Sequence, residues 1–240
     1  RFLNIGVEGQ LYIGALTAYL VAAQMEGIPS GLSIPLITLA SFIGGVAWLA
    51  IPLVLKIKLD INEIFPTVVM NFIAMFLISW LTRGPIKDPN SLNPQTRIIP
   101  QITWLPLILP GTRLHAGIIF AFFLAFLMYL ILYQTILGYE IRAVGLGSKA
   151  AKHSGINLSK NILSVGILSG GLAGLAGMVE VVGTHHFLIQ GFSPGFGYQG
   201  IAIAALGGFH PIGVVFGSIF FSILSIGGES MQRLSGVPID

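Results

Sequence analysis

The side chains that could do chemistry are few, and the most distinctive is an acid at the end of an apolar run. Glu180 lies near the end of residues 161–182 and is followed by His185 and His186. If the run crosses a membrane, Glu180 either lines a polar pathway or meets water at the interface, because an acid is costly in lipid. The adjacent histidines lack the spacing of metal ligands and no third ligand is evident, so we expect loop histidines close to such a pathway and no metal site.

Other polar side chains begin or interrupt apolar runs. Asn4 and Glu8, with Gln10, begin the first run, and Asn71 stands alone inside the third. Near a helix start such groups satisfy backbone amides, and a lone amide usually hydrogen-bonds to another helix. Lining a pathway is the alternative for each of them.

Three aromatic residues lie among glycines in residues 191–200, GFSPGFGYQG. They are Phe192, Phe196 and Tyr198. Aromatic rings on a glycine-rich backbone can stack on a flat ligand, whereas more often they anchor a chain at a membrane interface. Both interpretations stay open, and the first makes all three candidates for the substrate pathway.

A membrane enzyme is an alternative that would need a catalytic cluster, and only Glu180, His185 and His186 come close to one. The chain has no cysteine, which excludes a thiolate nucleophile and a Cys-based metal site. Neither a catalytic triad nor a phosphate-binding loop ending in Gly-Lys-Ser/Thr is evident. We therefore expect no enzyme activity and no cofactor, and if ATP powers the protein, another chain binds it. The net charge of +3 comes from loops without interleaved aromatics, which argues against nucleic-acid binding.

The composition indicates that lipid surrounds the elements that position these residues. Hydrophobic residues make up 54% and charged residues 9% of the 240 residues, with a mean hydropathy of +0.87. Soluble domains average about 25% charged residues. We predict an all-α, polytopic transmembrane helical bundle in the cell membrane, with about six spans plus a broken or re-entrant segment. The predicted spans are residues 5–23, 34–55, 64–81, 115–137, 161–182 and 213–226.

The broken segment lies between the last two spans. Glycine and proline interrupt residues 183–200, and residues 201–208 are too short to cross. Irregular backbone at membrane depth is tolerated only where protein or a water-filled cavity covers it. The chain, 1–240, then forms a single transmembrane domain. Because it starts at Arg1 without Met and ends just after an apolar run, we expect it to be truncated at one or both ends.

Small residues follow one face of the fifth span. Gly166, Gly170 and Gly174 lie four residues apart. Such a ladder lets another helix approach closely. The structural role is the expectation, and a contact that slides during transport is the alternative.

A basic loop, residues 138–160, separates the fourth and fifth spans. It contains four bases and one acid: Arg142, Lys149, Lys152, Lys160 and Glu140. A compact basic loop between two spans is expected on the cytoplasmic side, and residues 82–114 then lie outside. Ser148 can cap a short helix over residues 149–154, which include Ala150 and Ala151, and Gly155 can end it. Two helical turns are not stable alone in water, so this helix needs a partner protein.

Several motifs resemble those of one transporter family. GYEIRAVG, KAAKHSGIN and SGGLAGLAG, within residues 138–177, resemble the cytoplasmic coupling loop and following helix of ABC-importer permease subunits. NIGVEGQ at residues 4–10 and GFSPGFGYQGIA with ALGGFHPIG at residues 191–213 resemble other motifs of its simple-sugar and nucleoside branch, which is related to branched-chain amino acid permeases. Pro66 departs from the small residue usual there, which leaves the start of the third span open.

The resemblance implies a function and a set of partners. ABC ATPase subunits would dock inside on the coupling loop, an external substrate-binding protein would dock outside, and a second permease subunit, identical or homologous, would complete the pathway in membrane lipid. The residues expected to carry the ATPase contact are Arg142, Lys149, Ala150, Ala151 and Gly155.

The substrate expected from the resemblance is a nucleoside or purine-like solute. GYEIRAVG, EVVGTHHFL and GFSPGFGYQGIA are more similar to the nucleoside branch than to the ribose branch. The alternatives are an ABC permease for a simple sugar such as ribose and an ion-coupled secondary transporter. We see no inverted repeat for the latter, and Glu180 is its only strong candidate acid.

Overall fold

The computed structural model describes residues 2–235, and all named elements in this range are helices. In chain order they are α1 (Val7–Ala22), α2 (Ser30–Leu59), α3 (Ile64–Arg83), the 3₁₀ turn η1 (Gln101–Thr103), α4 (Gly117–Gln134), α5 (Ile136–Leu146), α6 (Ser148–His153), α7 (Leu158–Val179), the π-helical turn η2 (Glu180–His185), α8 (Phe196–Leu206) and α9 (Pro211–Ser235). The predicted all-α bundle is confirmed.

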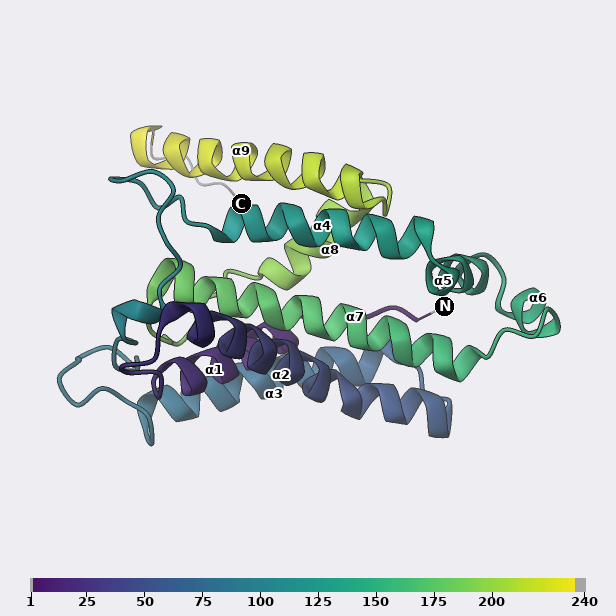
Figure 1. The fold of residues 1–240 in the computed structure, drawn as a ribbon, viewed down its shortest axis with the longest axis horizontal. Helices are drawn as coiled ribbons and strands as arrows, with labels where there is room; N and C mark the ends of the chain where they lie inside the picture. Colours follow the sequence, from purple (N-terminus) through teal and green to yellow (C-terminus); the bar gives the residue numbers. More distant parts are fainter. Residues whose placement is uncertain (1, 236–240) are drawn as a thin grey trace.

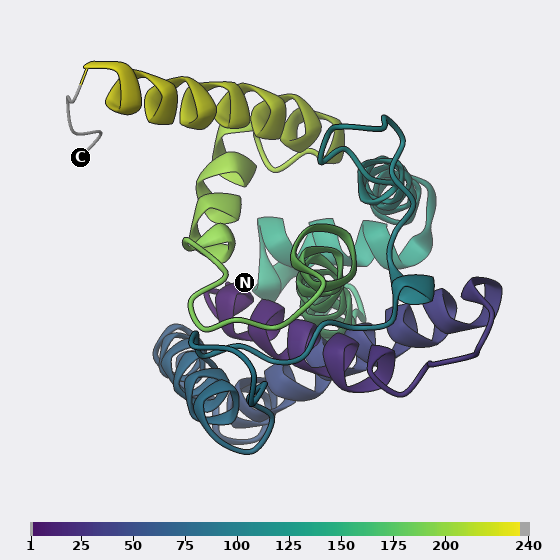
Figure 2. The ribbon, with the colours of Figure 1, turned by 90° about the vertical axis from the view of Figure 1, so that its left-hand side faces the viewer.

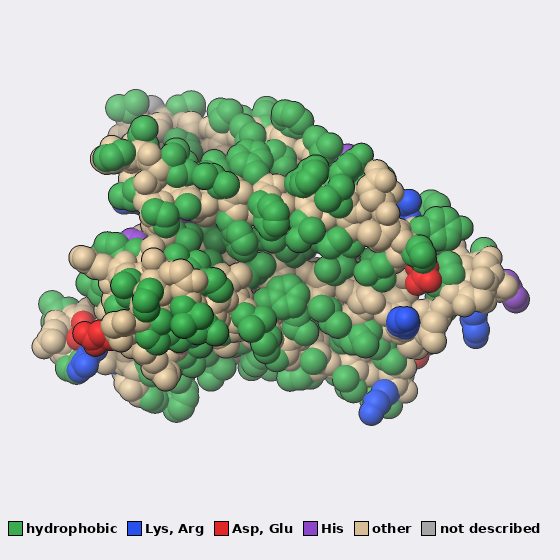
Figure 3. Space-filling model, viewed as in Figure 1, with side chains coloured by type: hydrophobic (Ala, Val, Ile, Leu, Met, Phe, Trp, Pro, Cys, Tyr) green, Lys and Arg blue, Asp and Glu red, His purple; other side chains and the backbone are tan. Residues whose placement is uncertain are grey.

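The long helices connect two ends of the molecule (Figure 1). Helices α5 and α6 lie at one end, here called the α6 end, and residues 84–116 form a long loop at the other, the loop end. On the face drawn in Figure 3, apolar side chains cover the middle and charged side chains gather toward the two ends. This distribution suits a chain whose middle lies in lipid.

Among the described residues, five helices are long and apolar enough to cross a membrane: α2, α3, α4, α7 with η2, and α9. The multi-pass membrane character is therefore confirmed. The predicted first span is shorter than expected, since α1 has 16 residues. It covers about 24 Å at 1.5 Å per residue, less than the roughly 30 Å of a hydrocarbon core.

Helix boundaries differ from the prediction where a local signal stops or prolongs the helix. The fourth span ends at Gln134, because Thr135 is extended and its hydroxyl accepts a hydrogen bond from Gly138 N (3.2 Å) at the start of α5. The sixth span is longer than 213–226, since α9 begins at Pro211, where proline costs no helical bond. Pro66 also lies in a first turn, that of α3, and is tolerated for the same reason.

The broken segment predicted before the last span is present. From η2 the chain returns as an irregular stretch into the bundle, α8 continues toward the α6 end, and α9 runs back (Figure 1). Helix α8 has only 11 residues. The turn that joins α8 to α9 is tight, because a Cβ on Gly207 would lie 2.5 Å from backbone atoms of Gly213 and Val214.

Helix α7 is the centre of the bundle when it is viewed along the helices (Figure 2). The predicted glycine ladder faces α2 at very short range. A Cβ on Gly170 would lie 2.9 Å from the Gly45 carbonyl oxygen, and one on Gly174 would overlap the Ser41 carbonyl oxygen. The ladder therefore brings the backbones of α7 and α2 together, as its spacing predicts.

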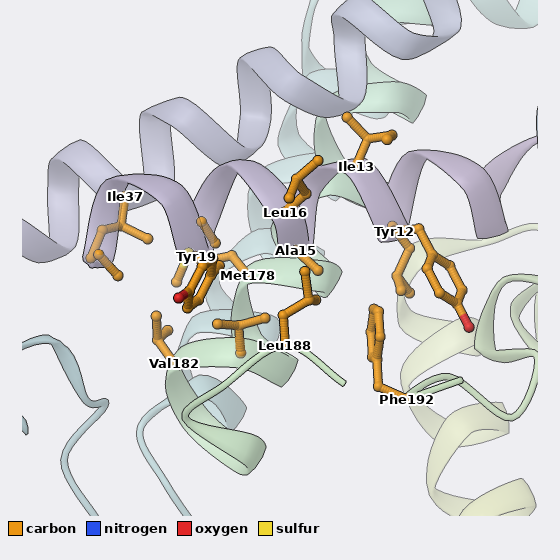
Figure 4. Packing of buried hydrophobic residues seen from close by; sticks show 14 of the residues in the cluster. Tyr12, Ile13, Ala15, Leu16, Tyr19, Ile37, Met178, Val182, Leu188 and Phe192 are labelled. Atoms are coloured by element: carbon orange, nitrogen blue, oxygen red, sulfur yellow. The ribbon is translucent and has the colours of Figure 1, made fainter. Parts of the chain in front are cut away.

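The hydrophobic core surrounds α1 (Figure 4). Tyr12, Ala15 and Tyr19 of α1 are buried, and they face residues of α2, α7, η2 and the stretch before α8. Because α1 is buried along most of its length, it needs small residues where other backbones pass. A Cβ on Gly9 would lie 2.9 Å from the Met70 carbonyl oxygen of α3.

The long loop 84–116 is fixed to the end of α7. Thr96 N donates to Leu188 O, Ile99 N to His186 O, and Leu105 N to Val182 O, each at 2.9 Å. The Trp104 and His186 rings stack with their centroids 3.8 Å apart. The loop therefore covers the irregular backbone that follows η2.

We predict that Gly174→Ala destabilises the protein by about 1–3 kcal/mol or more, because the added methyl group overlaps backbone of α2. The melting temperature of the detergent-purified protein should fall clearly. Gly200→Ala is the matched control, since a Cβ on this helical glycine meets no atom within 4 Å. Equal melting temperatures for the Gly174→Ala and Gly200→Ala proteins would contradict the close packing of α7 on α2.

Candidate functional site

The carboxylate of Glu8 accepts a hydrogen bond from the first turn of α8. Its Oε2 lies 2.6 Å from Gly197 N, and both residues are buried. The N-terminus of a helix carries unpaired N–H groups and a partial positive charge, so a carboxylate there is favourable. Gly197 permits the contact, because a Cβ at this position would lie 2.8 Å from Glu8 Cα.

Asn71 joins three elements through its side-chain amide. Its Oδ1 accepts from Gly9 N at 2.8 Å, and its Nδ2 donates to Ile5 O and to the Tyr198 hydroxyl, both at 2.9 Å. The side chain is fully buried. Asn71 of α3 thus holds the start of α1 and the first turns of α8.

Asn4 makes a further set of hydrogen bonds, on the side of α7. Its Nδ2 donates to Gln10 Oε1 and to Ser169 Oγ, both at 2.8 Å. Its Oδ1 accepts from Gly6 N and from Gln10 Nε2, both at 3.0 Å. These hydrogen bonds form three separate sets, each of which includes a residue at the start of the chain or of α1. We call their side chains and Gly197 together the polar hub: Asn4, Glu8, Gln10, Asn71, Ser169, Gly197 and Tyr198.

The polar hub brings together predicted site residues that lie up to 194 positions apart in the sequence. Asn4, Glu8 and Asn71 all find hydrogen-bond partners within the chain. This supports the structural interpretation of the three, and the pathway role stays a prediction. Ser169 and Gly197 were missed, because nothing in the sequence marks one serine or one glycine as the partner of a distant residue.

The three aromatic candidates have different surroundings. Phe192 is buried and its ring centroid lies 4.6 Å from that of Tyr12, so it belongs to the core. Tyr198 is partly exposed and holds Asn71 through its hydroxyl. Phe196 is also partly exposed and lines a cavity. The turn between them is fixed by Ser193 Oγ, which accepts from Phe196 N at 3.1 Å.

The cavity beside Phe196 has a volume of about 370 Å³ and lies between α1, α4, α7, η2 and α8. Its walls are apolar except for Glu180, the one ionisable side chain among the described residues that line it. Phe120 of α4 lines the same space. Two predicted pathway candidates, Glu180 and Phe196, therefore share one cavity, whereas Phe120 is one of many similar residues in a uniformly apolar run.

Glu180 begins the π-helical turn η2, in which each turn is wider than in an α-helix. Its Oε2 lies 3.6 Å from His185 Nε2. His186 points elsewhere, stacked on Trp104 under the loop. The described residues contain no group of three His, Cys, Asp or Glu side chains that could hold a metal ion.

The short helix of the basic loop is present as α6, with boundaries that differ slightly from the prediction. It begins at Ser148, whose neighbour Gly147 is the N-cap, so Ser148 does not cap it as predicted. Gly155 ends it with φ +86°, and its N–H donates to Lys152 O at 3.1 Å. Ala151 is buried against the chain itself, whereas Lys149 and Ala150 are exposed.

Arg142 lies on α5 and points back toward α4. Its guanidinium stands 4.7 Å from the centroid of the Tyr133 ring and donates to Leu132 O. The Tyr133 ring also lies 4.9 Å from His210, just before α9. Arg142 therefore fixes α5 to neighbouring elements, and the sequence did not indicate Tyr133 as its partner.

An ionic contact ties the start of the chain to the α2–α3 connection at the α6 end. Glu63 accepts from Leu3 N at 3.1 Å, and its Oε2 lies 3.4 Å from Lys56 Nζ. Burial opposes ionisation of Glu63, but backbone hydrogen bonds from Glu63 and Leu3, together with Lys56, outweigh it and lower its pKa. This contact stabilises the fold above the usual pKa of glutamate and is lost as the pH falls through the lowered value.

A family model described as "Branched-chain amino acid transport system / permease component" matches residues 1–236. The chain belongs to this family. The resemblance expected from its motifs is confirmed, and the family consists of permease components of transport systems.

Three named relatives align with nearly the whole permease. The glucose ABC transporter permease protein of Haloferax volcanii is 34% identical over 98% of this chain and 64% of its own. The guanosine ABC transporter permease protein of Bacillus subtilis is 34% identical over 98% of this chain and 68% of its own. The nucleoside ABC transporter permease protein of Lactococcus lactis is 30% identical over 98% of this chain and 67% of its own. The permease thus spans about two thirds of these relatives' length. No solved structure matches it.

We predict that Glu8→Ala destabilises the permease by about 1–3 kcal/mol, because it leaves the buried Gly197 N–H without an acceptor. The measurement is the melting temperature of the purified permease in detergent. Glu8→Gln is the matched control, since an amide oxygen can still accept this hydrogen bond. Its melting temperature should be close to that of the wild type. Equal melting temperatures for Glu8→Ala and wild type would rule out a stabilising polar hub.

Proposed function

We propose that this permease is the membrane-spanning subunit of an ATP-driven (ABC) importer for nucleosides or purine-like solutes. The observation that carries the proposal is α6, a two-turn helix exposed at one end of the bundle between two membrane spans. A helix this short gains stability from packing on other protein. Its buried side is held by Ala151, and its exposed side is free for an ATPase subunit.

The exposed side of α6 offers small and basic residues. Lys149, Ala150, Lys152 and His153 are exposed, and no acid occurs in the helix. Such a surface fits a groove with acidic edges on a partner, because complementary charges steer association. ATP would be bound by that partner, so this chain needs no cofactor of its own.

A route from α6 into the bundle is supported by the contacts of α5. Arg142 of α5 contacts Tyr133 at the end of α4, and Tyr133 contacts His210 at the turn before α9. Movement of α5 and α6 by closing ATPase subunits would therefore act on α4 and α9. Transport follows if the partners bind two arrangements of these helices differently.

Two further partners belong to the proposal. A substrate-binding protein would dock at the loop end, opposite α6. A second permease subunit, identical or homologous, would contact one of the exposed apolar helix faces, and lipid would cover the others. The permease itself would catalyse no chemical reaction.

Nucleosides are favoured over sugars by two observations. Relatives from Bacillus subtilis and Lactococcus lactis are named for guanosine and nucleosides. The cavity has apolar and aromatic walls with one carboxylate, which suits a flat base better than a sugar with hydroxyl groups all around. The alternative of a simple sugar has its own support in the glucose permease of Haloferax volcanii.

An ion-coupled secondary transporter is a second alternative. The pair of Glu180 and His185 in η2 is the observation that favours it, since such pairs can carry protons. The match of residues 1–236 to a permease component of a transport system argues against it.

We predict that Ala150→Glu lowers uptake by the complete importer at least about tenfold, because it buries an unpaired charge in the ATPase contact. Membrane insertion should be unchanged, since Ala150 is exposed in this chain. Co-purification of the ATPase subunit measures the contact directly. Ala150→Ser is the control. Glu at Ala151 would be a poor test, because that residue is buried within the permease.

Normal uptake by the Ala150→Glu variant would mean that α6 is not the coupling element. Loss of membrane insertion by this variant would point instead to a role of Ala150 within the fold, and would also contradict the proposed contact.

We predict that cells with the complete importer show saturable uptake of labelled guanosine or adenosine, because the cavity favours a flat base. Excess unlabelled nucleoside should compete, and ribose or glucose should not. Saturable uptake of a simple sugar that excess guanosine leaves unchanged would contradict the nucleoside assignment. The importer assignment would then still stand, since it depends on α6.

A further inference from the structure

Glu180 is an acid within an apolar cavity, and its hydrogen-bonding capacity is only partly used. A carboxylate has two oxygens with about four acceptor sites. Its partners within the chain are Thr184 and His185, both from the same turn. At least part of its acceptor capacity therefore stays open toward the cavity, where the other lining side chains are apolar.

The backbone at this position supports a functional role. Helix α7 is regular up to Val179 and changes to the π-helical turn η2 at Glu180. Such turns are rare, and they occur frequently at functional sites. The change begins at the residue that brings the carboxylate into the cavity wall.

The cavity also offers aromatic surfaces and a suitable size. Phe120 on α4 and Phe196 on α8 line it from different helices. Its volume of about 370 Å³ falls in the range of small-molecule sites, roughly 300–1,000 Å³. A flat ring that stacks on these side chains would bring its polar edge toward the one polar group in the wall.

We propose that Glu180 is the specificity-determining acceptor for the hydrogen-bond donor edge of a 6-oxopurine nucleoside, whose base stacks on Phe196 and Phe120. This rests on the proposed nucleoside function. Guanine presents two parallel donors, N1–H and the N2 amino group, which a carboxylate can accept together. Hypoxanthine presents only N1–H. Adenine presents an unprotonated N1, whose lone pair faces a carboxylate unfavourably, so adenosine is disfavoured.

The test compares uptake of guanosine, inosine and adenosine by cells that carry the complete importer with Glu180 or with Glu180→Gln. The external binding protein is the same in both, so a change in relative uptake originates in the permease. We expect the guanosine-to-adenosine ratio to fall at least about tenfold in the variant, because hydrogen bonds to a charged acceptor are lost. Inosine should show an intermediate change.

Matched variants separate this role from a general defect. Glu229→Gln removes an exposed acid on α9 that pairs with Arg233 at 3.1 Å, and it should leave the ratio at the wild-type value. Phe196→Leu should lower uptake of all three nucleosides at least about fivefold, because stacking is lost. Phe196→Tyr keeps the ring and should restore most of this uptake.

Each outcome decides between the proposals. If the wild-type importer takes up nucleosides and Glu180→Gln leaves their ratio unchanged, the role of Glu180 is overturned and the nucleoside importer stands. If the wild type imports only a sugar, both fall. If Glu180→Gln does not reach the membrane, Glu180→Asp provides the ratio, since it keeps the charge but withdraws it from the cavity. An unchanged guanosine-to-adenosine ratio in the Glu180→Asp variant overturns the proposal, and a lowered ratio supports it.

Discussion

The bundle depends on one contact between distant parts of the chain, the hydrogen bond from Gly197 N to the Glu8 carboxylate. Helix α8 begins inside the bundle, between its two ends (Figure 1). Lipid offers nothing to the unpaired N–H groups of a helix start, so the protein must supply the acceptors. Ser193 supplies one for Phe196 N and Glu8 supplies another. The broken segment is therefore possible because α1 passes beside it and places Glu8 next to the first turn of α8.

This constraint agrees with the burial of α1 along most of its length. The hydrogen bonds of Glu8, Asn71 and Asn4 can form together only if the start of α1 lies against α3, α7 and α8 at once. The close approach of α1 and α7 requires small residues, and Gly14 and Gly177 provide them, since a Cβ on either would overlap backbone of the facing helix. The polar hub and the glycine contacts thus form one packed body of α1, α2, α3 and α7.

The spans could be predicted because an apolar run of membrane length has few other uses, and α6 could be predicted in part from Gly155, which ends it. The polar hub could not, because nothing local connects Glu8 with a glycine 189 residues later. Sequence spacing also could not separate Phe192 from Phe196. The turn held by Ser193 directs one ring into the core and the other to the cavity. Phe120 is hidden in a run where every residue is apolar.

The cavity with Glu180 lies where the packed body meets a less tightly held layer. Helix α4 has a single buried residue, Gly117, whereas α1 is buried along most of its length. Regions with little buried surface rearrange at the lowest free-energy cost. Helices α4 and α9 are also the elements that α5 reaches through Tyr133 and His210. If ATPase subunits act on α6 as proposed, they would displace the weakly packed α4 wall of the cavity relative to the wall that carries Glu180. A ligand that touches both walls would then be bound differently in the two arrangements, which is the physical requirement for transport.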